Sequence, residues 1–144
     1  MIKLCENSDE FLDICEKLKE VKGARLTGKV LYTSMVAGLY NNQFFTYVSY
    51  DNDKMNGCLV LFLTKDQIGE LTMALFFTWI DVHYPKLLQE FIDITVQKAK
   101  ELKAEKISVI TNRNEKVIDR KIGKYGFKKT CSIWENRIEK DVII

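Results

Sequence analysis

The stretch that decides the fold is ELTMALFFTWI at residues 70–80, which is followed by a long helical pattern from Pro85 and by KISVIT at residues 106–111. Both short stretches are rich in apolar, aromatic and β-branched residues, as buried strands are. Apolar residues recur between them at helical spacing: Leu88, Phe91, Ile92, Thr95, Ala99 and Leu102. A helix that bridges two strands of one sheet requires a parallel crossover. The sheet therefore contains a parallel pair.

The rest of the chain extends this unit in both directions. Further strands are predicted at residues 2–4, 44–50, 58–63 and 127–138, and further helices at residues 7–22, 29–40 and 114–125. Asn7 is expected to open the first helix with Glu10 as its capping-box partner, and Pro85 to occupy the first position of the longest helix. The predicted order is β-α-α-β-β-β-α-β-α-β. This is an α/β fold with a mixed six- to seven-stranded sheet and helices on both faces.

Composition limits the class of protein. The chain has 144 residues, of which 47% are hydrophobic and 29% charged, with a net charge of +2. This balance is typical of one globular domain, which we expect to span residues 1–144. The chain contains no apolar run of the about 18 residues that a membrane span needs, and residues 1–10 do not have the pattern of a signal peptide. We therefore expect a cytoplasmic protein with no membrane partner.

The four cysteines, at positions 5, 15, 58 and 131, do not have the spacing of a zinc site. Three of them lie within apolar periodic runs, which favours small buried side chains. With a single histidine in the chain, we expect no metal site.

The order of elements, together with Asn114, the amphipathic segment after it and Tyr125-Gly126-Phe127, resembles the GNAT superfamily of acyl-CoA N-acetyltransferases. The resemblance covers nearly the whole chain and is strongest over residues 106–127. It implies that acetyl-CoA lies where the two parallel strands diverge, beyond the end of the strand at residues 70–80. In this family the pyrophosphate binds to a loop written Arg/Gln-x-x-Gly-x-Gly/Ala at the start of the next helix, where backbone N–H groups are unpaired.

The chain departs from this loop pattern. His83 falls at the arginine, Lys86 at a glycine and Leu88 at the small residue, while Pro85 removes one N–H donor. The resemblance nevertheless implies a set of cofactor-binding candidates at the strand end and the helix start: Trp79, Ile80, Lys86, Leu87, Leu88 and Asn114. Trp79 has a second interpretation as a core residue.

The resemblance also implies catalytic candidates. His83, beside Asp81, could act as a general base, or it could be an exposed loop histidine. Glu70 is the only acid on its strand, although it lies early on it. Tyr125 is one turn beyond Ile122, where the family carries the tyrosine that protonates the leaving thiolate.

Two functional hypotheses follow. The first is an N-acyltransferase that moves an acetyl group from acetyl-CoA to an amine acceptor. The second is a non-catalytic binding or assembly module of the same fold. Residues 113–129 carry seven basic and two acidic side chains, which could hold the 3′-phosphate of coenzyme A or form a solvated face; a nucleic-acid partner is not expected. The apolar tail at residues 142–144 suggests a homodimer.

Overall fold

The computed structural model describes residues 1–21, 26–109 and 115–130. The contacts within the chain form two compact units, residues 1–112 and residues 113–144, and each is described by itself. The expectation of one domain over residues 1–144 stays a prediction. No helix in the described ranges is both long and apolar enough to cross a membrane.

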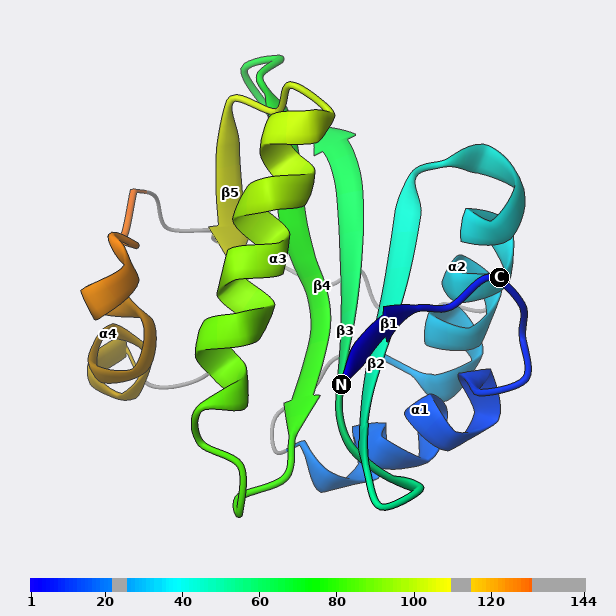
Figure 1. The fold of residues 1–144 in the computed structure, drawn as a ribbon. Helices are drawn as coiled ribbons and strands as arrows, with labels where there is room; N and C mark the ends of the chain where they lie inside the picture. Colours follow the sequence, from blue (N-terminus) through cyan, green and yellow to red (C-terminus); the bar gives the residue numbers. More distant parts are fainter. Residues whose placement is uncertain (22–25, 110–114, 131–144) are drawn as a thin grey trace, which may run out of the picture. The chain divides into compact units, whose positions relative to one another are not determined.

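A mixed sheet forms the centre of the first unit (Figure 1). Its strands lie in sequence order: β1 (Ile2–Leu4), β2 (Phe44–Asp51), β3 (Lys54–Lys65), β4 (Leu71–Ile80) and β5 (Lys106–Val109). The first four strands pair antiparallel, whereas β4 and β5 run parallel, from Thr72 opposite Lys106 to Leu75 opposite Val109. The parallel crossover predicted from residues 70–111 is confirmed.

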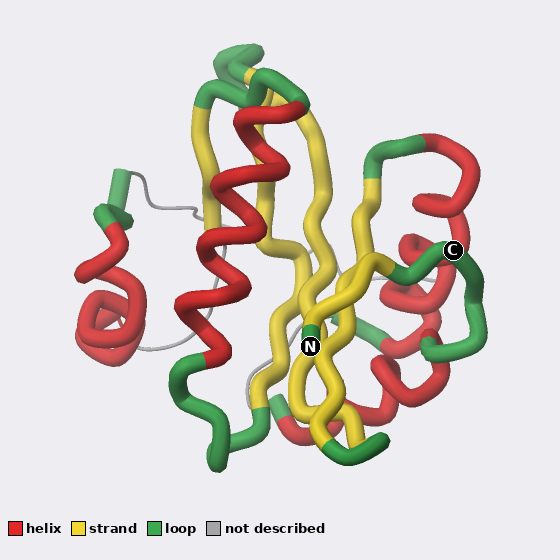
Figure 2. The backbone as a smooth tube through the Cα atoms, viewed as in Figure 1, coloured by secondary structure: helices red, strands yellow, loops and turns green. Residues whose placement is uncertain are grey.

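Helices cover both faces of this sheet. On one face lie α1 (Phe11–Lys17), the short 3₁₀ helix η1 (Leu18–Glu20) and α2 (Gly28–Asn41), and on the other lies α3 (Leu87–Glu101). Figure 2 shows α3 running alongside the strands, as expected for the crossover helix. The α/β class with helices on both faces is therefore confirmed.

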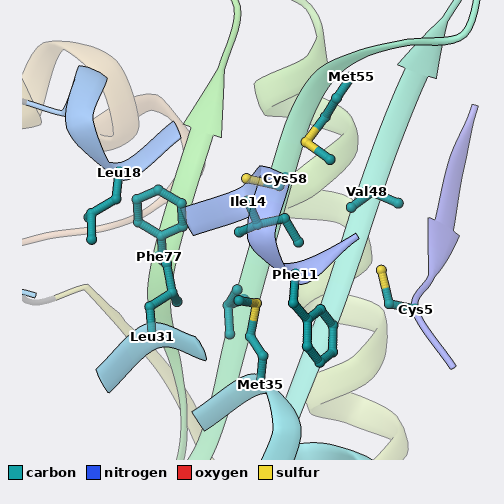
Figure 3. Packing of buried hydrophobic residues seen from close by; sticks show 11 residues of the cluster. Cys5, Phe11, Ile14, Leu18, Leu31, Met35, Val48, Met55, Cys58 and Phe77 are labelled. Atoms are coloured by element: carbon teal, nitrogen blue, oxygen red, sulfur yellow. The ribbon is translucent and has the colours of Figure 1, made fainter. Parts of the chain in front are cut away.

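The core under α1 and α2 is made of apolar side chains from both helices and from the inner face of β2–β4. Figure 3 shows Leu31 and Met35 of α2 and Phe11 and Ile14 of α1 gathered against it. All four side chains are at most 1% exposed. Each such burial contributes about 1.5–3 kcal/mol, so this layer holds the two helices on the sheet.

A second core lies under α3, where Leu87 and Phe91 pack against Leu59, Leu61 and Met73. Neighbouring residues of β3 alternate between the two cores, because successive side chains of a strand point to opposite faces. Residues 58–61 are therefore all fully buried. This explains why β3 is an almost unbroken apolar run, as predicted from its sequence.

A β-bulge interrupts the pairing of β3 with β4. Val60 lies opposite Phe77 and Leu61 opposite Leu75, which leaves Phe76 as the extra residue. Such a bulge bends its strand and increases the twist. The parallel ladder with β5 ends at Leu75 within the described residues, immediately before this bulge. The second half of β4 is thus directed differently from the first half.

Two predicted helix starts are wrong. α1 begins at Phe11, because Asn7 forms a local turn with the N–H of Asp9 at 3.0 Å. The Glu10 carboxylate does not form a capping box. It accepts a hydrogen bond from the Tyr50 hydroxyl and forms an ion pair with Lys3 at 3.1 Å.

The longest helix begins at Leu87 and not at Pro85. Pro85 lies inside a tight turn that the N–H of Leu87 closes onto the carbonyl of Tyr84 at 3.1 Å.

The second unit contains α4 (Glu115–Ile122) and the 3₁₀ helix η2 (Gly123–Tyr125). Gly126 ends this segment with φ of 90°, a conformation that glycine adopts without strain, as predicted. Residues 127–130 are not a strand. The rest of the predicted final strand, Cys131 and the tail at residues 142–144 lie outside the described residues. The described sheet has five strands, and the expected number of six to seven stays a prediction.

The cysteine interpretation holds for two residues in the described part. Cys5 and Cys58 are 7% and 0% exposed, and burial raises the pKa of each thiol to about 12. Both behave as buried apolar groups at neutral pH. Cys15 is half-buried and directs its thiol toward the carbonyl of Gly28 at 3.6 Å.

Candidate functional site

The candidate site lies where β4 ends and α3 begins, around residues 81–88. Two backbone hydrogen bonds fold this short segment: the N–H of Asp81 donates to Asn56 O at 2.9 Å, and the N–H of Tyr84 donates to Asp81 O at 3.0 Å. The first bond ties the segment to β3, and the second closes a turn. The start of α3 is thereby held at a defined place beside the sheet.

Asp81 and His83 form a pair within this segment. Asp81 Oδ1 accepts the backbone N–H of His83 at 2.9 Å and lies 2.7 Å from His83 Nδ1. These hydrogen bonds favour the carboxylate, so they hold the pKa of Asp81 below its usual value. The carboxylate in turn orients the ring so that the Nε2 nitrogen is left for another partner. The His83 side chain is 81% exposed.

Tyr84 connects the segment to the hairpin between β2 and β3. Its hydroxyl donates a hydrogen bond to Asp51 Oδ2. This bond, followed by burial and the charge of Asp51, raises the pKa of Tyr84 above its usual value. The hairpin turn itself is formed by Asn52 and Asp53, both with positive φ, which is typical of the tight turns that Asn and Asp favour.

The N-terminal end of α3 has no side-chain cap. Its N-cap residue is Lys86, which is exposed and accepts nothing from the first turn. The first N–H groups of a helix have no partner inside the helix, and they carry about half a positive charge. An exposed ammonium group beside these donors makes this end of α3 attractive to an anion.

Two hollows open next to this helix end. The smaller one is about 140 Å³ and is bordered by Asp51, Asn56, Asp81 and His83, among others. The larger one is about 510 Å³ and lies between the first turn of α3 and strands β2 and β3. The described part of the chain holds no group of three or more His, Cys, Asp or Glu side chains suited to a metal ion.

The structure brings together only part of the predicted site. His83, Lys86, Leu87 and Leu88 lie around the start of α3, where Lys86 is exposed and Leu88 is half-buried. Leu87 is buried at 5% exposure and packs into the core under α3. Ile80 borders that same core.

Other predicted residues lie elsewhere. Trp79 faces the core under α1 and α2, with the Lys17 ammonium 4.5 Å from its ring. Glu70 precedes β4, and since His83 follows β4, the ten-residue strand separates them; at about 3.3 Å per residue they are about 30 Å apart. Tyr125 belongs to the second unit, where Lys124 lies 5.2 Å from its ring. Asn114 lies outside the described residues.

Sequence reasoning missed Asp51, Ser49 and Asn56 at this place. Neither Asp51 nor Asn56 is among the site candidates that the sequence predicts. The structure instead places Asn56 within β3, and both Ser49 and Asn56 border the larger hollow. The available signal is a polar residue inside an otherwise apolar strand, and it is too common to single out a site.

The sequence matches no family model and no curated protein. The structure, in contrast, matches solved acetyltransferases over almost its entire length. One is the aminoglycoside 6′-N-acetyltransferase AAC(6′)-Ig of Acinetobacter haemolyticus, with a TM-score of 0.78 at 11% identity, covering 98% of this chain and 99% of that one. Another is AAC(6′)-Iy in complex with a bisubstrate analogue of coenzyme A, with a TM-score of 0.78 at 9% identity and coverages of 96% and 97%.

A third similar structure is a predicted acetyltransferase of Clostridium acetobutylicum with acetyl-CoA. Its TM-score is 0.75 at 14% identity, and the match covers 95% of this chain and 96% of that one. The fold is therefore that of the GNAT acetyltransferases, as the element order predicted. At these identities the likeness establishes the architecture, and function has to be argued from the site.

Proposed function

We propose that the protein is an N-acetyltransferase that uses acetyl-CoA as donor and an amine as acceptor. The observation that carries this proposal is the uncapped start of α3 with exposed Lys86, placed directly after the strand that pairs in parallel with β5. In open sheets, ligands bind beyond the carboxyl ends of such strands. The bulge at Phe76, where the described ladder with β5 has already ended, supports a divergence of the strands at this place.

The residues at this helix end fit a phosphate-bearing group. The N–H of Leu87 is already used by Tyr84 O, and Pro85 has none, but the N–H groups of Leu88 and Gln89 lie in the first turn of α3, where the helix offers no acceptor. The Lys86 ammonium adds a full charge beside them. Fewer backbone donors are present than in a glycine-rich loop, and we propose that Lys86 compensates for this loss.

Acetyl-CoA would supply the activated acetyl group as a thioester; its C–S bond would break as the amide bond forms, and coenzyme A would leave as a thiolate that takes up a proton. The acceptor amine must be unprotonated to attack it, so a proton has to be taken up nearby. We propose His83 for this step, because Asp81 holds Nδ1 and leaves Nε2 facing outward. The non-catalytic alternative is not favoured, since the solved structures that the chain resembles are acetyltransferases.

The direct test is whether the protein binds acetyl-CoA, and binding is measured by thermal unfolding and by calorimetric titration. A ligand at about a hundred times its Kd should stabilise the protein by about 2.7 kcal/mol. Lys86→Ala should weaken binding by up to about fivefold, because one exposed charge pair contributes up to about 1 kcal/mol. Lys100→Ala, exposed at the other end of α3, is the matched control and should bind normally.

Two results would contradict the proposal. If millimolar acetyl-CoA neither binds nor stabilises the unmodified protein, the enzymatic function is wrong. If acetyl-CoA binds and Lys86→Ala binds as well as Lys100→Ala, the cofactor is held elsewhere and the role given to Lys86 is wrong.

A further inference from the structure

The outer edge of β1 is open. β1 is the last strand on its side of the described sheet (Figure 1). Its inner edge is bonded to β2, and the N–H of Cys5, directly after the strand, still donates to Thr46 O at 2.8 Å. Backbone groups along an antiparallel strand alternate between its two edges. Those of Ile2 and Leu4 therefore point away from β2, and no described residue forms a hydrogen bond with them.

The side chains on one face of this edge are apolar and only partly covered. α3 packs mainly on β3, β4 and β5. Ile2 borders the core under α3, and Leu4, two residues later on the same face, is 41% exposed. Tyr47, which lies opposite Leu4 on β2, is half-buried. An apolar surface thus continues from this core to the open edge.

The charge at the centre of β1 does not prevent pairing with an identical strand. A lysine on an edge strand is a common protection against association, and Lys3 occupies this position. Its ammonium group lies 3.1 Å from the Glu10 carboxylate, which also accepts the hydroxyl of Tyr50. A two-fold axis at Lys3 would bring together two ammonium groups and two carboxylates, whose charges balance. The edge is therefore complementary to itself in charge and in backbone groups.

We propose that β1 pairs antiparallel with β1 of a second copy of the chain, which joins the two sheets across a two-fold axis at Lys3. Ile2 then lies opposite the partner's Leu4, and both residues donate and accept a backbone hydrogen bond. Apolar side chains of the two strands meet on the α3 face, where cross-strand pairs stabilise a sheet. Such a self-complementary contact is typical of symmetric dimers. The inference does not rest on the proposed function, since β1 and β5 are opposite edges of the described sheet.

The dimer should be weak. A strand of three residues contributes little area compared with the about 1,600 Å² of a standard interface. Association is therefore expected at high protein concentration, and sedimentation equilibrium of the full chain up to millimolar concentration measures it. A protein that is still monomeric at millimolar concentration would overturn the proposal.

Two substitutions at Leu4 locate the contact. Leu4→Pro removes the outward N–H, and an edge strand tolerates proline where its N–H faces solvent. Leu4→Ala is the matched control, because it shortens the same side chain and keeps the N–H. Leu4→Pro should raise the dissociation constant of the dimer at least about tenfold above that of Leu4→Ala, since two symmetry-related hydrogen bonds are lost. Equal dissociation constants for both variants would show that the dimer forms through another surface.

Hydrogen exchange of the unmodified protein provides a second measurement, which holds even if Leu4→Pro fails to fold. The amides of Ile2 and Leu4 should exchange more slowly as protein concentration rises, because pairing protects them. The amide of Lys3, which faces β2, should be equally protected at low and high concentration. Exchange of Ile2 and Leu4 that does not depend on concentration would contradict the pairing.

Glu10→Gln tests the charge balance at the two-fold axis. The variant keeps an oxygen for the Tyr50 hydroxyl but leaves the lysines of the two copies opposed. Like charges opposite each other destabilise paired strands, so the dissociation constant of the dimer should rise by about threefold. Glu16→Gln, which removes a carboxylate paired with Lys19 on α1, is the control and should dimerise normally. Equal dissociation constants for these two variants would exclude a two-fold axis at Lys3.

Discussion

The hydroxyl of Tyr84 donates a hydrogen bond to Asp51, a residue 33 positions earlier in the chain. This bond joins the segment after β4 to the hairpin between β2 and β3. Because Leu87 N–H is bonded in turn to Tyr84 O at 3.1 Å, the position of Tyr84 also determines where α3 begins. The start of the helix that we propose as the phosphate site thus depends on a contact with a distant hairpin.

Removing the Tyr84 hydroxyl should loosen this segment without unfolding the protein. In Tyr84→Phe, amide hydrogen exchange should become faster for residues 82–87, because local opening no longer breaks the bond to Asp51. Exchange in the centre of β3 should be unchanged. Tyr40→Phe, at a tyrosine that is 85% exposed, is the control and should exchange like the unmodified protein. Equal protection of residues 82–87 in Tyr84→Phe and Tyr40→Phe would show that the bond does not hold the segment.

Replacing His83 should separate catalysis from cofactor binding. If His83 takes the proton from the amine, His83→Ala should lower kcat by about 10²-fold or more and leave the Kd for acetyl-CoA unchanged. Steady-state kinetics with a primary amine acceptor and calorimetry with acetyl-CoA measure the two quantities. Because His83 is also three residues from Lys86, the opposite pattern, a weaker Kd with unchanged kcat, would assign it to the cofactor and exclude it as the base.

The packing of α2 on β2 predicts opposite effects of the same substitution at two glycines. A Cβ at Gly38 would lie 2.5 Å from the carbonyl oxygen of Phe44, a backbone atom that cannot move aside. Overpacking costs about 1–3 kcal/mol, which exceeds the gain of up to about 1 kcal/mol from alanine in a helix. Gly38→Ala should therefore lower the free energy of unfolding, measured by urea denaturation.

Gly28, the first residue of the same helix, has no atom within 4 Å of an added Cβ. Gly28→Ala should leave the free energy of unfolding unchanged or raise it by a few tenths of a kcal/mol. If both variants are equally stable, the close approach of α2 to Phe44 is absent in solution.

The buried thiol of Cys58 should make stability fall at alkaline pH. Burial raises its pKa from 9.0 to about 12, so the folded state keeps a proton that the unfolded state loses. This contribution is complete below about pH 9 and is lost as pH rises toward about 12, by up to about 1.4 kcal/mol per pH unit. Urea unfolding at about pH 9 and about pH 11 should show a smaller loss for Cys58→Ala than for the unmodified protein. An identical loss in both would contradict the shifted pKa.

Local patterns were sufficient for most of the elements. The almost unbroken apolar run of β3 and the apolar stripe of α3 are visible in the sequence, because burial on both faces of a strand, or on one face of a helix, selects apolar side chains at those positions. The first residues of the helices were harder to predict from the sequence. Glu10 was expected in a capping box, but its carboxylate contacts Tyr50 and Lys3, and these come from segments that no local pattern relates to it.

Only part of the candidate site could be predicted from local sequence patterns. His83 and Lys86 were predicted from the resemblance to the family's pyrophosphate loop, and the structure places both between the end of β4 and the start of α3. Glu70 was grouped with them, although β4 separates it from His83. Asn56 was not predicted as a site residue, because its burial results from the packing of β3 within the tertiary structure. The expected homodimer stays a prediction, which sedimentation of the full chain would test.

The sequence by itself determined the order of the elements, the parallel crossover between β4 and β5 and the apolar faces of the helices, since these follow from the period and type of neighbouring residues. Only the tertiary structure decided that Asp51 meets Tyr84, that Trp79 and Ile80 face different cores, and that the side-chain oxygen of Asn56 is buried with no hydrogen-bond partner among the described residues. These relationships arise when strand pairing and helix packing bring distant residues together, and no local pattern encodes which side chains will then meet.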